Sequence, residues 1–265
     1  MSKETYSPFD WYETPIYYDI VFDEDTDIEA DFLERMLDMY GKSDGRDSLE
    51  PACGTGRLML ELGRRGFDVT GFDISRPSLD YAKKRLEEEE LTGEVFEGRM
   101  EAFETERQYD MAYSMVSTFK YILELDDAKN HLRCVAKALK PGGIYILGFH
   151  LTHESINEES VERWTGQRGK TQVVCKIKSW APDHQARRER VRSRLVVREG
   201  NDVKRYETEW DFRLYNADEV RELIASVPEL EHVGTWDFHF NRDRTDERLE
   251  RRYDCVLILR KVAED

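Results

Sequence analysis

Short apolar runs alternate with amphipathic helical patterns between residues 46 and 150. The runs at 68–72, 109–115 and 144–149 have the length and composition of buried strands. Between the first two of these runs, residues 76–89 repeat apolar side chains at helical spacing. Strands that alternate with helices in this way predict a parallel sheet covered by helices.

This alternation stops after residue 150 and a period of two replaces it. Tyr206, Trp210 and Phe212 fall on one side of a predicted strand, and charged residues occupy the positions between them. The stretches at 191–197 and 173–177 repeat the pattern. Residues 151–215 are therefore expected to form a small antiparallel β insertion after the fifth strand. It would be a lid over the carboxyl ends of the strands, or it would only extend the edge of the sheet.

The last fifty residues return to the earlier pattern. Asn216 and Glu219 have the spacing of a capping box that opens a helix. Two strands are expected at 232–240 and 253–259, joined by a charged hairpin loop at 241–252. Residues 46–150 and 216–265 would then build one core, and the aromatic-rich residues 1–45 would be an N-terminal cap segment.

A turn of short residues follows the first core strand. It contains Ala52, Gly54, Thr55 and Gly56, and Asp73 ends the next strand nineteen residues after Gly54. Short residues allow backbone N–H groups to approach a ligand closely, and an acidic residue at that strand end can accept hydrogen bonds from a ribose. A dinucleotide fingerprint needs a third glycine, but Met59 stands there, so a single nucleoside fits better than NAD.

Three motifs in order carry a family resemblance. They are Glu50-x-Ala52-Cys53-Gly54-Thr55-Gly56, then Gly71-Phe72-Asp73-Ile74-Ser75, then Leu139-Lys140-Pro141-Gly142-Gly143. This arrangement resembles the class I S-adenosylmethionine-dependent methyltransferases. The resemblance implies a Rossmann-like α/β fold with a seven-stranded, mostly parallel sheet and an antiparallel last strand. It also implies S-adenosylmethionine as cofactor, with S-adenosylhomocysteine as product, and no metal.

The resemblance assigns cofactor contacts to individual positions. Asp73 would bind the ribose hydroxyls, Ile74 would lie against adenine, and Glu50 would face the amino group of the methionine moiety. The full set of expected cofactor contacts is Tyr18, Glu50, Ala52, Gly54, Thr55, Gly56, Arg57, Asp73, Ile74, Met100, Glu101, Ser114 and Met115.

One stretch departs from the family pattern. Where the family usually has Gly-Asp after the third strand, this chain has Gly98-Arg99. Arginine has no hydrogen-bond acceptor, so it cannot replace the aspartate that would accept from the adenine amino group. Either the backbone of Met100 contacts adenine alone, or the Glu101 carboxylate substitutes for the missing one.

The residues after the fourth strand bear on the methyl acceptor. Ser114-Met115-Val116-Ser117 with Lys120-Tyr121 resembles the small-molecule N-methyltransferases, including those for amino sugars and glycine, and no Asn/Asp-Pro-Pro-Tyr motif occurs there. A small soluble acceptor methylated at nitrogen is therefore expected. Alternatives are an O-methyltransferase of a small hydroxylated acceptor and a non-catalytic cofactor-binding sensor or partner subunit. Tyr12 and His150 are the candidate catalytic residues facing the acceptor.

The net charge and the cysteine content limit the kinds of partner and compartment that we expect. The net charge of −16 repels phosphate backbones and makes a nucleic-acid substrate less favourable. Four scattered cysteines without metal-ligand spacing fit a reducing compartment, and no long apolar run or signal segment is present. We therefore expect a cytoplasmic protein without membrane contact, with a homodimer as a possible assembly.

Overall fold

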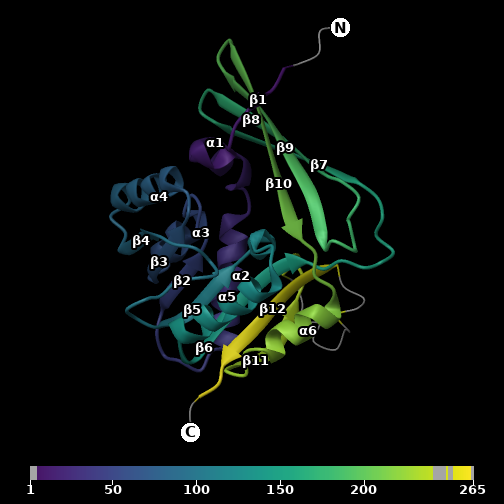
Figure 1. The fold of residues 1–265 in the computed structure, drawn as a ribbon. Coiled ribbons are helices and arrows are strands. Elements are labelled where there is room, and N and C mark those ends of the chain that lie inside the picture. Colours follow the sequence, from purple (N-terminus) through teal and green to yellow (C-terminus); the bar gives the residue numbers. More distant parts are fainter. Residues whose placement is uncertain (1–4, 241–248, 250–252, 264–265) are drawn as a thin grey trace.

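The computed structural model describes residues 5–240, 249 and 253–263. Its larger sheet has seven strands (Figure 1). In spatial order these are β11 (Leu230–Trp236), β12 (Asp254–Lys261), β6 (Leu139–His150), β5 (Tyr109–Ser114), β2 (Asp47–Pro51), β3 (Asp68–Asp73) and β4 (Gly93–Glu97). Strand β12 is antiparallel to both of its neighbours, and the ladders from β6 to β4 are parallel. The predicted Rossmann-like sheet with an antiparallel last strand is confirmed.

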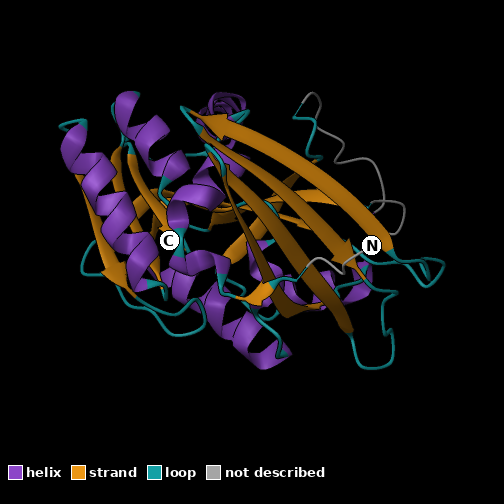
Figure 2. Ribbon diagram, turned by 90° about the horizontal axis from the view of Figure 1, so that it is seen from above, coloured by secondary structure: helices purple, strands orange, loops and turns teal. Residues whose placement is uncertain are grey.

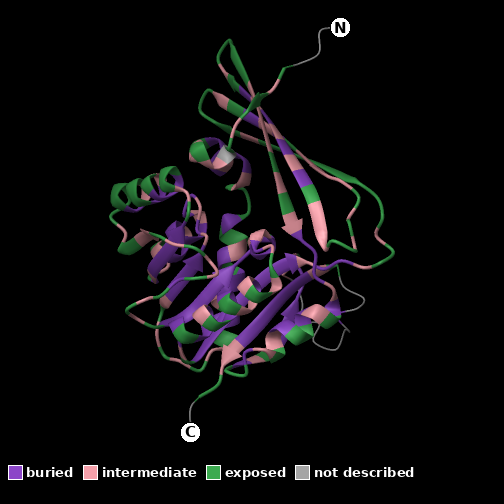
Figure 3. Ribbon diagram, in the orientation of Figure 1, coloured by how far each residue is buried: buried purple, intermediate pink, exposed green. Residues whose placement is uncertain are grey.

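Helices cover both faces of this sheet (Figure 2). Helices α2 (Thr26–Tyr40), α3 (Arg57–Arg64) and α4 (Arg76–Glu88) contribute to one apolar core, and α5 (Leu125–Ala138) and α6 (Ala217–Ala225) to another. Side chains alternate between the two cores along β5, where Met111 and Tyr113 join the first and Ala112 joins the second. The central strands are consequently buried throughout (Figure 3), as a parallel sheet requires.

A second, smaller sheet is inserted between β6 and α6. It contains β1 (Ser7–Pro8), β10 (Asp202–Arg213), β9 (Arg188–Glu199), β8 (Thr171–Ser179) and β7 (Ser160–Arg168), in that order. The last four form an antiparallel meander, and β1 pairs in parallel with β10. The apolar face packs on α1 (Pro15–Phe22), where Tyr17, Ile20 and Val21 contact buried side chains of β8 and β9.

Some boundaries differ from the predicted ones. The strand expected at 144–149 is longer than predicted, because β6 already begins at Leu139, directly after α5 ends at Ala138. The capping box of Asn216 and Glu219 opens α6 as predicted. The predicted hairpin loop at 241–252 lies almost wholly outside the described residues.

The smaller sheet stands near the carboxyl ends of the central strands (Figure 1). Strand β10 contacts the short helix η2 (Thr118–Tyr121), which follows the end of β5. Among the described residues, no helix combines the length and apolar character needed to span a membrane.

Candidate functional site

A cavity of about 640 Å³ opens at the carboxyl ends of β2, β3 and β5. The loop after β2, the turn after β3 and the segment that follows β5 line it, together with N-terminal residues near Tyr12 and Tyr18. Parallel sheets place ligand sites at this edge, where consecutive strands diverge and loops supply the contacts.

The loop after β2 is attached to the end of β3 through one carboxylate. Asp73 accepts a hydrogen bond of 2.9 Å from Gly54 N–H at Oδ2 and one of 2.8 Å from Ser75 N–H at Oδ1. The side chain is mostly buried, and burial raises the pKa of Asp73 although these backbone donors act in the opposite direction. Each oxygen retains a lone pair that can accept from a ligand hydroxyl.

The same loop leaves room for a bound nucleoside. A Cβ added at Gly54, whose φ is +52°, would project into open space. Ala52 also has a positive φ, +56°, an uncommon conformation for a residue with a side chain. This open cradle beside Asp73 fits the ribose and methionine moieties of S-adenosylmethionine.

Two residues of this loop region that were predicted as cofactor contacts have mainly structural contacts. Gly56 is not among the residues that line the cavity; it caps α3, and an added Cβ would lie 3.0 Å from Ala82 Cβ. Arg57 lines the cavity, but its guanidinium donates to Glu29 at 2.8 Å and to Thr26 Oγ1 at 3.1 Å. Arg57 therefore fixes α3 to α2.

Glu50 is a buried carboxyl group in the cavity wall. Tyr113 donates a hydrogen bond of 3.2 Å to its Oε2. Burial raises the pKa of Glu50 to about 8, against the opposing effects of Arg57 and Tyr113. A cationic group placed beside this carboxyl would favour its ionised form. The site therefore fits the ammonium group of the methionine moiety.

The predicted adenine end is built from the turns after β3 and β4. Ile74 lines the cavity with a relative exposure of 67%, so its side chain is available to a planar ring. Gly98, Arg99, Met100 and Glu101 also line this end. Arg99 forms an ion pair of 2.5 Å with Glu101. The carboxylate proposed to replace the missing aspartate is therefore held by the arginine that occupies the aspartate's position.

A buried histidine fixes the backbone at Met100. His131 Nδ1 lies 3.0 Å from the Met100 carbonyl oxygen, and His131 Nε2 lies 2.8 Å from the Tyr145 hydroxyl. Burial lowers the pKa of His131 to about 4, so the ring is neutral near pH 7. Because a carbonyl only accepts, Nδ1 donates to Met100 and Nε2 accepts from Tyr145. The Tyr145 hydroxyl in turn contacts Ser114, which also lines the cavity.

Two aromatic hydroxyls also line the cavity. The hydroxyl oxygens of Tyr12 and Tyr121 are 2.8 Å apart. Burial raises the pKa of both hydroxyls, so both keep their protons near neutral pH. The ring of Tyr18 lies 5.8 Å from that of Tyr12, and burial raises the pKa of Tyr18 to about 12. The Tyr12–Tyr121 pair could not be predicted from the sequence, because 109 residues separate its members.

The segment that joins β5 to η2 has an unusual backbone. Val116 and Ser117 have φ values of +54° and +64°. A positive φ is rare for a β-branched residue, and such strain concentrates at functional sites. Met115 and Val116 line the cavity here, next to Ser114.

His150 lies elsewhere. It is the last residue of β6 and pairs with Asp254 of β12, and it is not among the residues lining the cavity. Its ring stacks on Tyr253 at 4.6 Å, and Nδ1 lies 3.0 Å from Asp254 Oδ1. Burial and then Lys120 lower the pKa of His150, while Asp254 opposes this shift. The structure therefore does not bring His150 together with the other predicted site residues.

Thirteen of the fifteen site residues predicted from the sequence line this one cavity, and Tyr121, which was not predicted as a site residue, lines it as well. The predicted residues in the lining are Tyr12, Tyr18, Glu50, Ala52, Gly54, Thr55, Arg57, Asp73, Ile74, Met100, Glu101, Ser114 and Met115. Four acidic residues in the lining also had no sequence signal: Asp10, Glu13, Glu124 and Asp127.

Comparison with known proteins agrees with this geometry. The family described as "Methyltransferase domain" matches residues 49–143. A protein of Geobacillus sp. (strain WCH70), provisionally named a methyltransferase, is 29% identical over 145 residues, which are 54% of this chain and 59% of that protein. The matched segment thus spans less than two thirds of that relative. A ubiquinone biosynthesis O-methyltransferase of Alkalilimnicola ehrlichii is 29% identical over 117 residues, 44% of this chain and 47% of that protein.

Solved structures match over nearly the whole chain. The sugar N-methyltransferase KedS8 of Streptoalloteichus sp. has a TM-score of 0.75 at 18% identity, covering 100% of this chain and 98% of its own. An amino pentose methyltransferase of Micromonospora echinaspora, solved with S-adenosylmethionine bound, has a TM-score of 0.70 at 15% identity, covering 98% and 100%. At these identities the likeness concerns the fold. The fold and the matched domain are those of class I S-adenosylmethionine-dependent methyltransferases, and S-adenosylmethionine is the cofactor of this class.

Proposed function

We propose that this protein transfers the methyl group of S-adenosylmethionine to an amine nitrogen of a small soluble acceptor. The observation that carries the proposal is a cavity lined both by Asp73 and Ile74 and by the Tyr12–Tyr121 hydroxyl pair. A volume of about 640 Å³ is in the range of pockets that hold small molecules.

The chain's own residues would bind and orient the cofactor. Asp73 would accept from the ribose hydroxyls, Glu50 would face the ammonium group, and Ile74 would lie against adenine. When bound, S-adenosylmethionine supplies an electrophilic methyl group on a sulfonium. As the new nitrogen–carbon bond forms, the carbon–sulfur bond breaks and sulfur keeps its electron pair. Positioning and exclusion of water then supply much of the acceleration.

The charge of the cavity favours a cationic acceptor. Among the described residues that line it, seven carry carboxyl groups and three carry guanidinium groups. Such an excess attracts a protonated amine and disfavours an acceptor that carries phosphate. The carboxyl groups would concentrate the protonated amine near the cavity, where it exchanges its extra proton with solvent and the neutral form enters, so methylation at nitrogen requires no protein base.

The tyrosine pair would orient the acceptor. In a hydrogen bond between two protonated hydroxyls, one donates and the other retains its proton for a further partner. The pair of Tyr12 and Tyr121 can therefore donate one hydrogen bond into the cavity. Because their pKa values are raised, neither tyrosine would act as a base near neutral pH.

The smaller sheet would be the lid of this site. Trp210 and Phe212 of β10 contact the ring of Tyr121, with centroid distances of 6.2 and 4.8 Å. Lys120, also in η2, forms an ion pair of 3.0 Å with Glu189 of β9, and its side chain is only 6% exposed. The sheet thus rests directly on the segment that carries the proposed acceptor contact.

A hydroxyl acceptor is the second candidate, because a relative named as an O-methyltransferase also matches. Methylation of a hydroxyl usually needs a base to remove the proton. The position of His150 outside the cavity lining favours nitrogen over oxygen.

The test uses S-adenosylmethionine with a labelled methyl group and amino sugars supplied in pairs, each free amine beside its N-acetyl counterpart. The pair keeps every other hydroxyl and blocks only the nitrogen. We expect label in the free amines and none in the acetylated partners, and less label where a diphosphate is attached. Equal labelling within a pair would show O-methylation and contradict the proposal. Binding of the cofactor without label in any amine would support the sensor alternative.

A further inference from the structure

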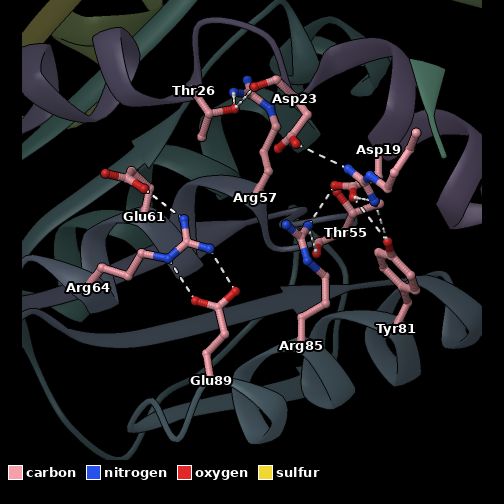
Figure 4. A network of polar contacts seen from close by, with 11 residues as sticks. Asp19, Asp23, Thr26, Thr55, Arg57, Glu61, Arg64, Tyr81, Arg85 and Glu89 are labelled. Atoms are coloured by element: carbon pink, nitrogen blue, oxygen red, sulfur yellow. Dashed lines mark hydrogen bonds and ion pairs between the residues drawn. The ribbon is translucent and has the colours of Figure 1, made fainter. Parts of the chain in front are cut away.

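The buried carboxylate of Asp19 connects the smaller sheet to the Gly54–Gly56 loop. Asp19 of α1 is fully buried and lies among side chains from two other elements, α4 and β7 (Figure 4). Arg85 of α4 donates to its Oδ1 at 2.6 Å, and Tyr81 of the same helix donates to its Oδ2 at 3.0 Å. Arg168, the last residue of β7, also donates to Oδ2, at 2.8 Å.

These partners compensate the buried negative charge of Asp19, which would otherwise be very unfavourable. A buried carboxylate is stable only when it is paired and hydrogen-bonded. Here one guanidinium comes from the cofactor-binding core and the other from the smaller sheet, with Asp19 between them. The relative position of the two parts therefore determines how well Asp19 is paired.

The connection continues to the cavity wall. Arg85 Nη1 also lies 3.5 Å from the carbonyl oxygen of Thr55, at the outer limit of a hydrogen bond. Thr55 lines the cavity between Gly54 and Gly56. The chain of contacts thus runs from Arg168 through Asp19 and Arg85 to the loop that would hold the methionine moiety.

The strand and the helix approach closely at this point. A Cβ added at Gly166, two residues before Arg168, would lie 1.9 Å from the carbonyl oxygen of Ile20. Only glycine allows β7 to lie against α1 at this distance. Arg168 also pairs with Asp23, beyond the end of α1, at 3.1 Å. Strand β7 is therefore held against α1 at Asp19 and Ile20 and against Asp23 just beyond the helix.

We propose that Asp19 is a positioning residue that couples the placement of the smaller sheet to the geometry of the Gly54–Gly56 loop. This inference rests on the proposed function, in which the loop binds the cofactor and the sheet covers the acceptor. Arg168 then influences cofactor affinity without touching the cavity, since it is not among the residues that line it.

The informative change is Arg168→Ala. It leaves Asp19 paired with Arg85 and Tyr81, so the fold is expected to survive. We expect the dissociation constant of S-adenosylhomocysteine, measured by calorimetry, to rise three- to tenfold. Arg168→Lys, which retains a donor for Asp19, should restore part of the affinity.

Arg64→Ala is the matched control. Arg64 donates to both oxygens of Glu89, an ion pair between α3 and the end of α4, but it is exposed and has no contact with Asp19 (Figure 4). We expect its effect on affinity to stay below twofold. Thermal unfolding of both variants shows whether a loss of affinity comes from lower stability of the fold or from a change in the Gly54–Gly56 loop.

Three results decide the inference. If the unmodified protein binds no S-adenosylhomocysteine, the proposed function fails. If it binds and Arg168→Ala binds equally well, the coupling is refuted while the proposed function stands. If Arg168→Ala and Arg85→Ala each weaken binding and the double variant is no weaker than Arg85→Ala alone, the two arginines act through one path, as proposed.

Discussion

The backbone N–H of Gly54 donates a hydrogen bond of 2.9 Å to Asp73 Oδ2. It joins the loop after β2 to the end of β3, so one carboxylate both shapes the cavity and is available to a ligand. Loss of Asp73 should therefore affect the loop and the ligand contact together.

We predict that Asp73→Ala weakens binding of S-adenosylhomocysteine at least tenfold. Hydrogen bonds to charged groups contribute about 1.5–3 kcal/mol each, and the alanine variant loses those to the ribose. Asp73→Asn keeps one acceptor oxygen and should show an intermediate loss. Calorimetry measures both, with NADH as a control ligand. Unchanged affinity in the alanine variant would remove Asp73 from the site, and tighter binding of NADH would contradict the cofactor assignment.

The affinity for the cofactor should depend on pH through the carboxyl group of Glu50. Its pKa of about 8 means that the carboxyl group is largely protonated at pH 7 in the free protein. A bound ammonium group favours the carboxylate, so binding releases a proton and affinity rises as pH rises from 6 to 7.5. With nearly one proton released per binding event, the rise should be roughly 25-fold over this interval.

The check is calorimetry in buffers of different ionisation enthalpy, which reports the protons released. Glu50→Gln cannot release this proton, so its affinity should be lower and nearly independent of pH over the same interval. Proton release that persists unchanged in Glu50→Gln would assign the titration to another group.

For the adenine end of the cavity, we predict which of two substitutions weakens cofactor binding more. Glu101→Gln should weaken cofactor binding modestly, by about two- to fivefold, because a neutral amide oxygen accepts more weakly than a carboxylate. Arg99→Ala should change it by less than twofold, since Arg99 is exposed and pairs with Glu101 at the rim. Equilibrium titration of both variants with S-adenosylhomocysteine measures the order. The reverse order would mean that the arginine itself contacts the ligand.

The lid is tested by Trp210→Ala and Phe212→Ala together. Both side chains contact Tyr121, so their removal should lower turnover at least tenfold while cofactor affinity stays within twofold. Size-exclusion chromatography runs in parallel, because the same aromatic strip could join two copies of the chain. A variant that becomes monomeric yet keeps full turnover would make the strip an interface and refute the lid.

The sequence predicted the parts of the site that depend on local order. Gly54 and Asp73 follow adjacent parallel strands, so their proximity follows once β2 and β3 are recognised. The three strands with period-two alternation were also predicted, because the alternation is visible in the local order of residues. Strand β7 was missed because its residues are mostly exposed and show no alternation.

Contacts between distant segments could not be predicted in this way. The pairing of Tyr12 with Tyr121 depends on how the N-terminal segment folds over η2. His150 was predicted to face the acceptor, but it lies beside the antiparallel strand β12, where its ring stacks on Tyr253. The backbone of Met100 was one of two candidates for the adenine contact, beside Glu101, and only the structure shows that His131 already holds the Met100 carbonyl.

The most direct test of this account is a crystal structure of the protein with S-adenosylhomocysteine. We predict ribose hydroxyls within hydrogen-bonding distance of Asp73, adenine against Ile74, the amino group beside Glu50, and sulfur directed toward Tyr12 and Tyr121. Ligand density outside this cavity, or a ribose with no contact to Asp73, would contradict the central claim that the cavity is the methyl-donor site.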